Sequence, residues 1–214
     1  MADFTENFNE ISELLQKGKA KDIVVAVQKA LDAGAPAQDI LEKGLIAGMN
    51  IIGGKFKRGE VFVPEVLIAA RAMNNASVTL KPALIQAGVQ PVGKAIICTV
   101  KGDLHDIGKN LVKMMIEGKG IEVLDLGVDC GDEKIINVVR DSDAKVLCLS
   151  ALLTTTMMAL KDTIDALKSA GLRDKIKVMV GGAPVTQSFA DEIGADAYTP
   201  DAAGAAEVCR AFYN

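Results

Sequence analysis

The sequence predicts an α/β protein in which an N-terminal four-helix bundle precedes a doubly wound, five-stranded parallel sheet. Two observations carry this prediction. Residues 4–77 show the spacing of amphipathic helices, and from residue 95 onward short apolar runs alternate with helical stretches. Half of the 214 residues are apolar and 24% are charged, as in chains that fold around a sizeable core. We expect a helical domain over residues 1–88 and a second domain over residues 94–214.

Two short helices begin the expected bundle. Apolar residues at spacings of four and three run from Phe4 to Leu15, and the pattern stops at Gly18. The same periodicity covers residues 23–31 and stops at Gly34. Because glycine commonly follows the last residue of a helix, these two positions predict both helix ends.

The third and fourth helices are expected on either side of an apolar connection. A third stripe covers residues 41–52, although two glycines inside it weaken the prediction of a helix. The fourth helix starts near Pro64, since proline is tolerated in the first turn. Its expected inner face is formed by Leu67, Ala70, Met73 and Ser77. The connection over residues 53–64, GGKFKRGEVFVP, is too apolar for a solvated loop, so we expect another part of the molecule to cover it.

A change of period marks the second domain. Glycine and proline interrupt the helical pattern over residues 87–94, which predicts a linker. Five short apolar runs follow at the rhythm of consecutive βα units, over residues 95–100, 121–126, 145–149, 176–180 and 196–198. We expect a flavodoxin-like strand order, 2-1-3-4-5. In such sheets a ligand lies beyond the carboxyl ends of the strands, so the loops after strands 1, 3, 4 and 5 are the candidate site.

Composition argues against several classes of function. The 24 Lys and Arg against 28 Asp and Glu give a net charge of −4 without a block of like charge, so we expect no nucleic-acid partner. The N-terminus lacks the basic start and apolar core of a secretory signal, and no apolar run reaches the ~18 residues of a membrane span. The four cysteines form no CxxC pair, and we expect Cys98, Cys130 and Cys148 to be buried. A cytoplasmic protein without membrane association is the expectation.

The loop after the first strand, KGDLHDIGKN, contains the only histidine of the chain, His105. A lone histidine is more often structural, but this one stands at a strand end that faces the expected ligand crevice. Asp103 can accept a hydrogen bond from one ring nitrogen, which fixes the tautomer and makes the other nitrogen a better metal ligand. One protein ligand cannot hold a free ion, since zinc and iron sites need three or four. Any metal must therefore arrive with most of its ligands attached, as in a macrocyclic cofactor.

Three motifs at the expected loops carry a resemblance. The pattern D-x-H-x-x-G at residues 103–108, with S-x-L at 150–152 and G-G at 181–182, resembles the signature of cobalamin-binding domains that bind the cofactor base-off and His-on. The N-terminal helices resemble the helical cap of methionine synthase and of the corrinoid proteins of methyltransferase systems. The stretches SALLTTTM (150–157) and GGAPVTQ (181–187) are most similar to corrinoid proteins that serve methylated amines or betaines.

The resemblance implies roles for individual residues. His105 would be the lower ligand of cobalt, Asp103 would orient it, and Thr156 would continue the relay where methionine synthase has serine. The alternative for Thr156 is a helix N-cap. Small residues after strands 3 and 4 would let the nucleotide tail approach the backbone, and the alternative is ordinary core packing. The further implied cofactor-binding residues are Gly102, Asp106, Ile107, Gly108, Ser150, Leu152, Thr154, Thr155, Gly181, Gly182, Tyr198, Thr199, Asp201 and Ala202.

Phe56 and Val63 match the positions that lie over the upper face of the corrin in the methionine synthase cap. An apolar lid there would protect a methyl–cobalt bond and would have to move when a partner reaches the cobalt. The alternative is that both side chains belong to the core of the bundle.

The function that the resemblance implies is that of a methyl carrier. A substrate-specific methyltransferase would load the cobalt from a methylated amine or betaine, and an acceptor methyltransferase would unload it onto a pterin or thiol. A reductive activation protein is a further candidate partner. The chain shows no base or nucleophile of its own for the upper face, so we expect a carrier more than an enzyme. The alternative is a cobalamin-responsive sensor, which would need an output module that the sequence does not show.

Overall fold

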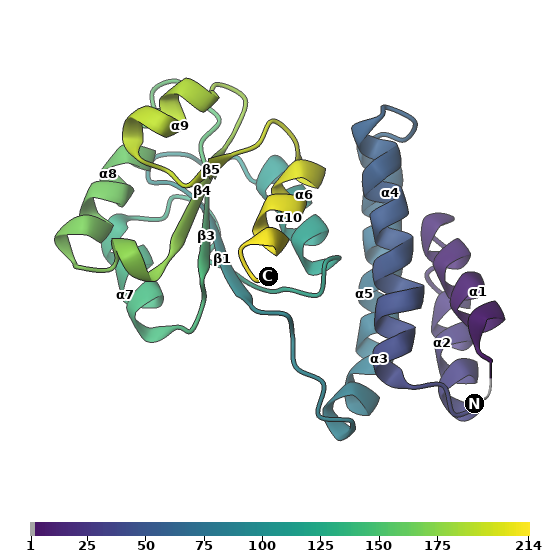
Figure 1. Ribbon diagram of the computed structural model, residues 1–214. Helices are drawn as coiled ribbons and strands as arrows, with labels where there is room; N and C mark the ends of the chain where they lie inside the picture. The colour runs from purple at the N-terminus through teal and green to yellow at the C-terminus, as the bar shows by residue number, and fades with distance from the viewer. Residues whose placement is uncertain (1–2) are drawn as a thin grey trace. The chain divides into compact units, whose positions relative to one another are not determined.

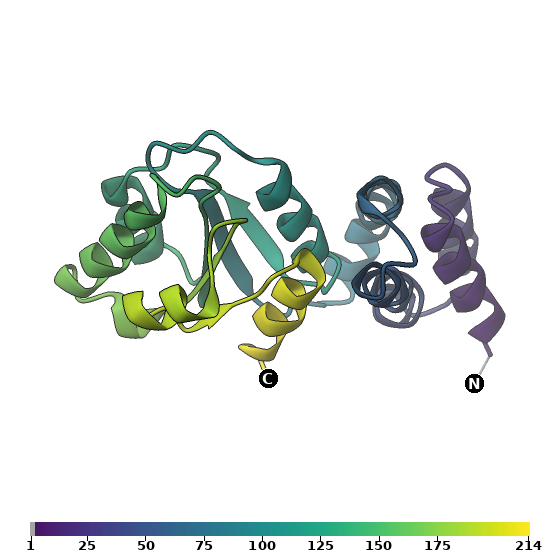
Figure 2. The ribbon, with the colours of Figure 1, turned by 90° about the horizontal axis from the view of Figure 1, so that it is seen from above.

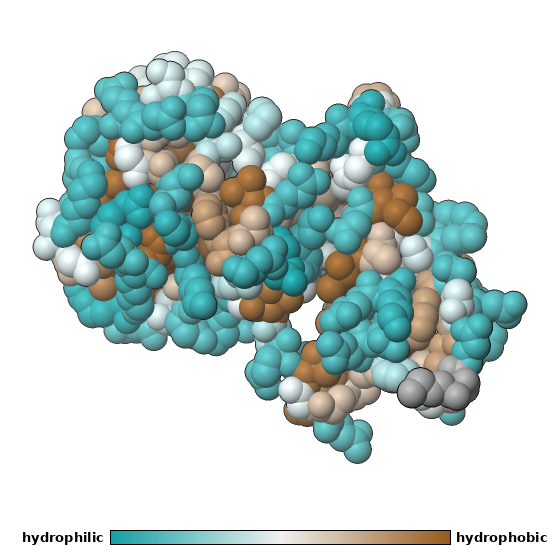
Figure 3. Space-filling view, viewed as in Figure 1, coloured by the Kyte–Doolittle hydropathy of each residue, from teal (hydrophilic) through white to brown (hydrophobic). Residues whose placement is uncertain are grey.

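The computed structural model describes residues 3–214, which form two compact units (Figure 1). One unit contains the residues up to Pro91 together with Gly118–Gly120, and the other contains Val92–Glu117 and Ile121–Asn214. The first is helical and the second is α/β. Polar side chains cover much of the face of each unit that Figure 3 shows, with apolar side chains in small patches. No helix in residues 3–214 is both long enough and apolar enough to cross a membrane.

The helical unit is a four-helix bundle, as predicted. Its segments are α1 (Thr5–Gln16), α2 (Asp22–Asp32), α3 (Ala37–Asp39), η1 (Ile40–Ile46), α4 (Ala47–Lys57) and α5 (Val63–Gln86). The segments α3, η1 and α4 follow one another without a break, and η1 is π-helical. Two glycines in this stretch let α1 pack closely against it. A Cβ on Gly44 would lie 3.0 Å from Cγ2 of Ile11, and one on Gly48 would lie 3.1 Å from the carbonyl oxygen of Ser12.

The predicted connection over residues 53–64 is wrong in its first half, because α4 continues through Lys57. Glycines inside a helix cost only about 1 kcal/mol each, and the apolar face of α4 continues to pack in the bundle. The helix ends in a Schellman motif at Gly59, which has φ +70. There the Gly59 N–H donates to the Phe56 carbonyl and the Glu60 N–H to the Lys55 carbonyl, at 3.0 and 2.9 Å.

The inner face of α5 also differs from the prediction. Leu67 was expected to be buried but is 39% exposed, whereas Val66 is fully buried. The helix turns its alanine-rich side inward, burying Val66, Ala69, Ala70, Ala72, Met73, Ala76 and Leu80. Small side chains on this face allow close helix packing, which a search for large apolar residues overlooks.

The α/β unit is built on five parallel strands in the predicted order, β2-β1-β3-β4-β5. The strands are β1 (Lys94–Thr99), β2 (Glu122–Asp125), β3 (Val146–Ser150), β4 (Lys177–Gly181) and β5 (Ala197–Tyr198). The helical segments are α6 (Ile107–Glu117), α7 (Asp132–Asp141), α8 (Met157–Ser169), η2 (Arg173–Lys175), α9 (Gln187–Ile193) and α10 (Ala202–Ala211). Helices α7, α8 and α9 cover one face of the sheet, and α6 and α10 cover the other (Figures 1 and 2). The strand order reverses between β1 and β3, which is where such folds bind ligands.

The sheet is buried on both faces, which explains why its inner strands are almost continuously apolar. Ile96, Leu147 and Val178 lie on adjacent strands and are fully buried in one core with α7, α8 and α9. Cys98, Cys130 and Cys148 are buried free thiols, as predicted.

Candidate functional site

The candidate site lies at the carboxyl edge of the sheet, where the ends of β1, β3 and β4 are level. Thr99 pairs with Ser150, and Ser150 pairs with Gly181. The loops that leave these three strands therefore start side by side. They contain the DLH, SALL and GG sequences that the sequence analysis singled out.

Asp103 is the centre of this site. It is fully buried, and both carboxylate oxygens accept hydrogen bonds. Oδ1 accepts from the backbone N–H of His105 at 3.0 Å and from ring atom Nδ1 at 2.7 Å. Oδ2 accepts from the backbone N–H groups of Leu152 and Leu153, at 2.7 and 3.4 Å, and from Thr156 Oγ1 at 2.7 Å. One carboxylate thus ties the loop after β1 to the loop after β3.

The partners of Asp103 keep it ionised. Burial by itself would raise the pKa of this carboxyl, but the hydrogen bonds from His105, Leu152 and Thr156 hold the pKa well below its usual range. An ionised carboxylate beside Nδ1 favours the tautomer in which Nδ1 carries the proton and donates it.

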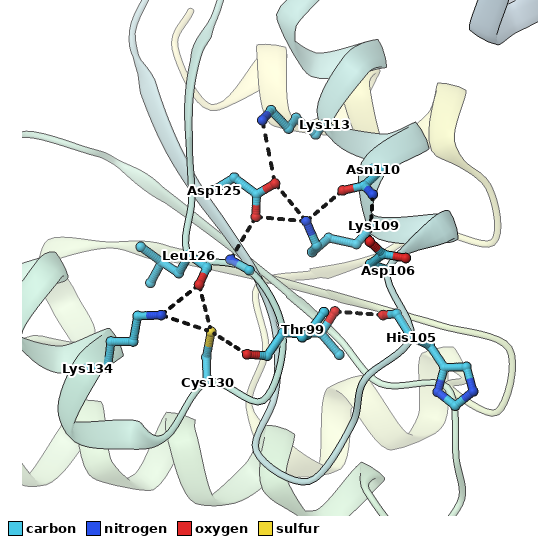
Figure 4. A network of polar contacts seen from close by, with 12 residues as sticks. Thr99, His105, Asp106, Lys109, Asn110, Lys113, Asp125, Leu126, Cys130 and Lys134 are labelled. Atoms are coloured by element: carbon cyan, nitrogen blue, oxygen red, sulfur yellow. Dashed lines mark hydrogen bonds and ion pairs between the residues drawn. The ribbon is translucent and has the colours of Figure 1, made fainter.

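His105 is therefore held in a form that presents Nε2 as the free nitrogen of the ring. Its side chain is half exposed, and Figure 4 shows the ring pointing away from the neighbouring polar network. An imidazole oriented through Nδ1–H by a carboxylate is well suited to bind a metal through Nε2. No group of three or more metal-ligating side chains occurs in the described part of the chain. These residues fit a metal that arrives within its own macrocycle.

Thr156 lies immediately before α8, but its side chain does not cap that helix. Its Oγ1 lies 2.7 Å from Asp103 Oδ2 and 2.9 Å from the carbonyl oxygen of Leu153. A hydroxyl has one proton to donate, and the ionised carboxylate is the stronger acceptor. The geometry therefore favours the contact with Asp103 over the capping alternative.

The glycines of the site fall into two groups. A Cβ on Gly182, which has φ +133, would lie 1.8 Å from the carbonyl oxygen of Ala151, so the packing of the chain itself requires glycine there. A Cβ on Gly181 would have its nearest neighbour, the Thr199 carbonyl oxygen, at 3.9 Å, and one on Gly108 would meet nothing within 4 Å. Packing within the chain therefore does not explain Gly181 and Gly108, and the space beside them is open.

Large apolar side chains surround His105 in an exposed position. Leu104 and Ile107 are 71% and 78% exposed, and Leu152 is 40% exposed. Thr154 and Thr155, on the same loop as Leu152, are exposed as well. Clustered apolar exposure of this kind marks a surface that a ligand or partner covers. Leu104 was not among the residues predicted for the site.

A polar network lies beside the histidine loop (Figure 4). The Nζ of buried Lys109 is 2.7 Å from both carboxylate oxygens of Asp125, the last residue of β2, and 2.7 Å from Asn110 Oδ1. Asn110 in turn donates to Asp106 Oδ2 at 3.0 Å, and Lys113 lies 3.5 Å from Asp125. The start of α6 is thereby fixed to the end of β2.

The residues predicted at and after the end of β5 and in the cap take no part in the hydrogen bonds of the Asp103 carboxylate. Asp201 caps α10, accepting from the Gly204 N–H at 2.8 Å, so its carboxylate already has a partner. Tyr198 packs partly against the core of the sheet, and Ala202 is buried. Phe56 and Val63 belong to the helical unit, at the end of α4 and the start of α5, and both are partly buried.

Two residues that contact the histidine loop were not predicted from the sequence. Thr99 donates from Oγ1 to the carbonyl oxygen of His105 at 2.8 Å, and Asp129 accepts through Oδ1 from the Gly102 N–H at 2.7 Å. A polar residue closing an apolar strand was the available signal for Thr99. Asp129 offered no such signal in the sequence, because its contact joins two loops that are distant along the chain.

Comparison with known proteins places the chain in a family. Family models described as B12 binding domains match residues 93–209 and residues 8–81. Dimethylamine corrinoid protein 3 of Methanosarcina acetivorans is 42% identical over 205 residues, covering 96% of each protein. Monomethylamine corrinoid protein 2 of that organism is 42% identical over 208 residues, covering 95% of this chain and 96% of the relative.

Two solved structures are similar over nearly the whole chain. A cobalamin-binding protein from Desulfitobacterium hafniense DCB-2 has a TM-score of 0.81 and 31% identity, with 99% of each chain covered. The methanol:cobalamin methyltransferase complex MtaBC from Methanosarcina barkeri has a TM-score of 0.87 and 30% identity, with 97% of this chain and 80% of that chain covered. The chain belongs to the family of corrinoid proteins of methyltransferase systems.

Proposed function

We propose that this protein carries methyl groups from a methylated amine to an acceptor methyltransferase, which passes them to a pterin or thiol. A substrate-specific methyltransferase loads the carrier, and a reductive activation protein restores it after oxidation. One observation carries the proposal. The Asp103 carboxylate holds the His105 ring with Nε2 directed outward, at the strand-order reversal and among exposed apolar side chains.

Bound cobalamin supplies the cobalt centre on which a methyl group can be held and released. His105 would hold the cofactor through Nε2, in place of the cofactor's own base. Asp103 keeps the Nδ1 proton in place, and Thr156 donates to the far oxygen of the same carboxylate. The protein would tune the cofactor through this one ligand and its hydrogen bonds.

The proposed tail slot follows the loops after β3 and β4. Open space at Gly181 supports it. Its proposed lining is Ser150, Leu152 and the exposed Thr154 and Thr155. The backbone N–H groups at the start of α10 are the proposed contacts for the ribose or phosphate. The cap is assigned to residues 1–88, with Phe56 and Val63 as its lid, and the cofactor domain to residues 94–214. A cytoplasmic location is part of the proposal.

The test uses the whole chain reconstituted with hydroxocobalamin and reduced to Co(II). Because His105 is the only histidine, ¹⁵N-histidine labelling should change the superhyperfine pattern in the electron spin resonance spectrum. Coupling to the benzimidazole nitrogen instead of histidine would refute the assignment of His105 as the cobalt ligand. The substrate arm reduces the carrier further, to Co(I), and incubates it with methyltransferases specific for monomethylamine, dimethylamine or betaine. Formation of methylcobalamin, followed by absorbance, should occur with an amine enzyme, and exclusive loading by the betaine enzyme would contradict the amine assignment.

A further inference from the structure

We infer that Thr99 and Asp129 are positioning residues for His105. They hold the backbone of the loop in the conformation that presents the imidazole, and neither touches the ring. The inference rests on the proposed role of His105 as the cobalt ligand. It concerns the end of β1 and the segment between β2 and α7, neither of which donates to the Asp103 carboxylate.

Thr99 anchors the carbonyl group of His105. It is the last residue of β1 and is fully buried. Its N–H donates to the carbonyl of Gly127 and its carbonyl accepts from the Cys130 N–H, both at 3.0 Å. These bonds fix the backbone of Thr99, and its hydroxyl donates to the His105 carbonyl at 2.8 Å (Figure 4).

Asp129 holds the start of the same turn. Its Oδ1 accepts from the N–H of Gly102 at 2.7 Å, and its own N–H donates to the carbonyl of Asp103 at 3.0 Å. Asp129 is also the only non-glycine residue with positive φ in residues 3–214, at φ 49. Non-glycine residues persist in that region when surrounding contacts over-determine them, and such residues concentrate at functional sites. Here the contacts are those to the histidine loop.

The two residues act on opposite ends of one short turn. Asp129 fixes residues 102 and 103, and Thr99 fixes residue 105. The hydrogen bond between Asp103 Oδ1 and His105 Nδ1 spans the interval between these anchors. Without either anchor, the turn gains freedom and the ring no longer has one orientation. The segment over residues 127–130 therefore supports the backbone of the loop that presents His105.

The test compares two matched pairs of variants. Thr99→Val removes the hydroxyl and keeps the shape, while Thr99→Ser keeps the donor. Asp129→Gly removes the carboxylate and still accepts positive φ, while Asp129→Asn keeps an acceptor and tolerates that conformation. In the cofactor-free protein, the Val and Gly variants should exchange the His105 backbone amide about fivefold to tenfold faster, which corresponds to the loss of about one net hydrogen bond. They should also lower the Nδ1–H fraction in the ¹⁵N spectrum of the single imidazole. The Ser and Asn variants should restore both.

The same variants are then loaded with Co(II) cobalamin, and the fraction with histidine coupled to cobalt is measured. We expect this fraction to fall in the Val and Gly variants. Lower resistance to urea with unchanged amide exchange, tautomer and coupling would show that both residues are only structural. If Thr99→Val does not fold, the Asp129 pair decides alone. Absence of histidine coupling in the unaltered protein would refute the proposed function, while the cofactor-free measurements would still decide this inference.

Discussion

Replacing Asp103 by Asn tests the site most directly, because all five contacts of its carboxylate are with donors. The amide of Asn keeps one acceptor oxygen and brings one NH2 group. With NH2 at the Oδ1 position, the ring of His105 can change tautomer to accept, but the His105 backbone N–H cannot. With NH2 at the Oδ2 position, Thr156 can rotate to accept, but the Leu152 N–H cannot.

Either orientation therefore leaves a backbone N–H facing another donor. An unsatisfied group of this kind costs about 1–3 kcal/mol, and the surviving bonds lose the strength that the negative charge gave them. We expect Asp103→Asn to lower the free energy of unfolding of the α/β unit by about 2–5 kcal/mol at pH 7. The chain has no Trp, and its two tyrosines, Tyr198 and Tyr213, both lie in this unit. Tyrosine fluorescence during urea unfolding thus reports on the α/β unit alone.

The difference between the two proteins should also depend on pH in a defined direction. The pKa of Asp103 is lower in the folded than in the unfolded protein, where it is ordinary, at about 3.9. Its contribution to stability is therefore complete above about pH 5 and is lost as the pH falls below about 4 toward the folded pKa. The advantage over Asp103→Asn should shrink in that window. A variant within 0.5 kcal/mol of the original protein at pH 7, with the Nδ1–H tautomer intact, would refute this account of the carboxylate.

Four further changes have distinct expected outcomes. Gly181→Val should keep the fold but weaken binding of complete cobalamin more than binding of a corrinoid without the nucleotide, and equal losses would argue against the slot. Gly182→Ala should lower the stability of the α/β unit by more than about 2 kcal/mol even without cofactor, because its Cβ would meet backbone. Lys109→Met should lower stability by about 2–4 kcal/mol in urea unfolding, since the partly exposed carboxylate on β2 loses its main partner; a neutral effect would contradict this. Replacing both Phe56 and Val63 by Ala should speed photolysis of bound methylcobalamin with little change in the helical unfolding midpoint, whereas early melting with unchanged photolysis would identify both as bundle core.

The strands and most helix ends could be predicted because local chemistry determines them. A strand buried on both faces must be apolar throughout, and the glycines at 18 and 34 supply the positive φ that ends α1 and α2. The extension of α4 through its glycines could not be predicted, because packing within the bundle outweighs a local preference. The prediction placed the exposed Leu67 on the inner face of α5, because alanines rather than large side chains make most of the contacts of that face.

Within the site, residue type and strand position were sufficient to select Asp103 and His105. The role of Thr156 stayed open in the sequence because a threonine before a helix is an equally good cap, and only its distance to Oδ2 decides. Asp129 escaped notice for a different reason. Its partner, the N–H of Gly102, lies 27 residues away along the chain, and nothing in the local pattern connects them.

The arrangement around Asp103 has a consequence for how the protein handles its ligand. One oxygen of the carboxylate contacts only the loop after β1, and the other contacts only the loop after β3. A change in the charge or position of the His105 ring alters the strength of its hydrogen bond to Asp103 Oδ1. The shared carboxylate transmits that change to the Leu152 N–H and the Thr156 hydroxyl. Coupling of this kind is reciprocal. Whatever shifts the loop after β3 must therefore act on the His105 ring through the shared carboxylate, with the same coupling free energy.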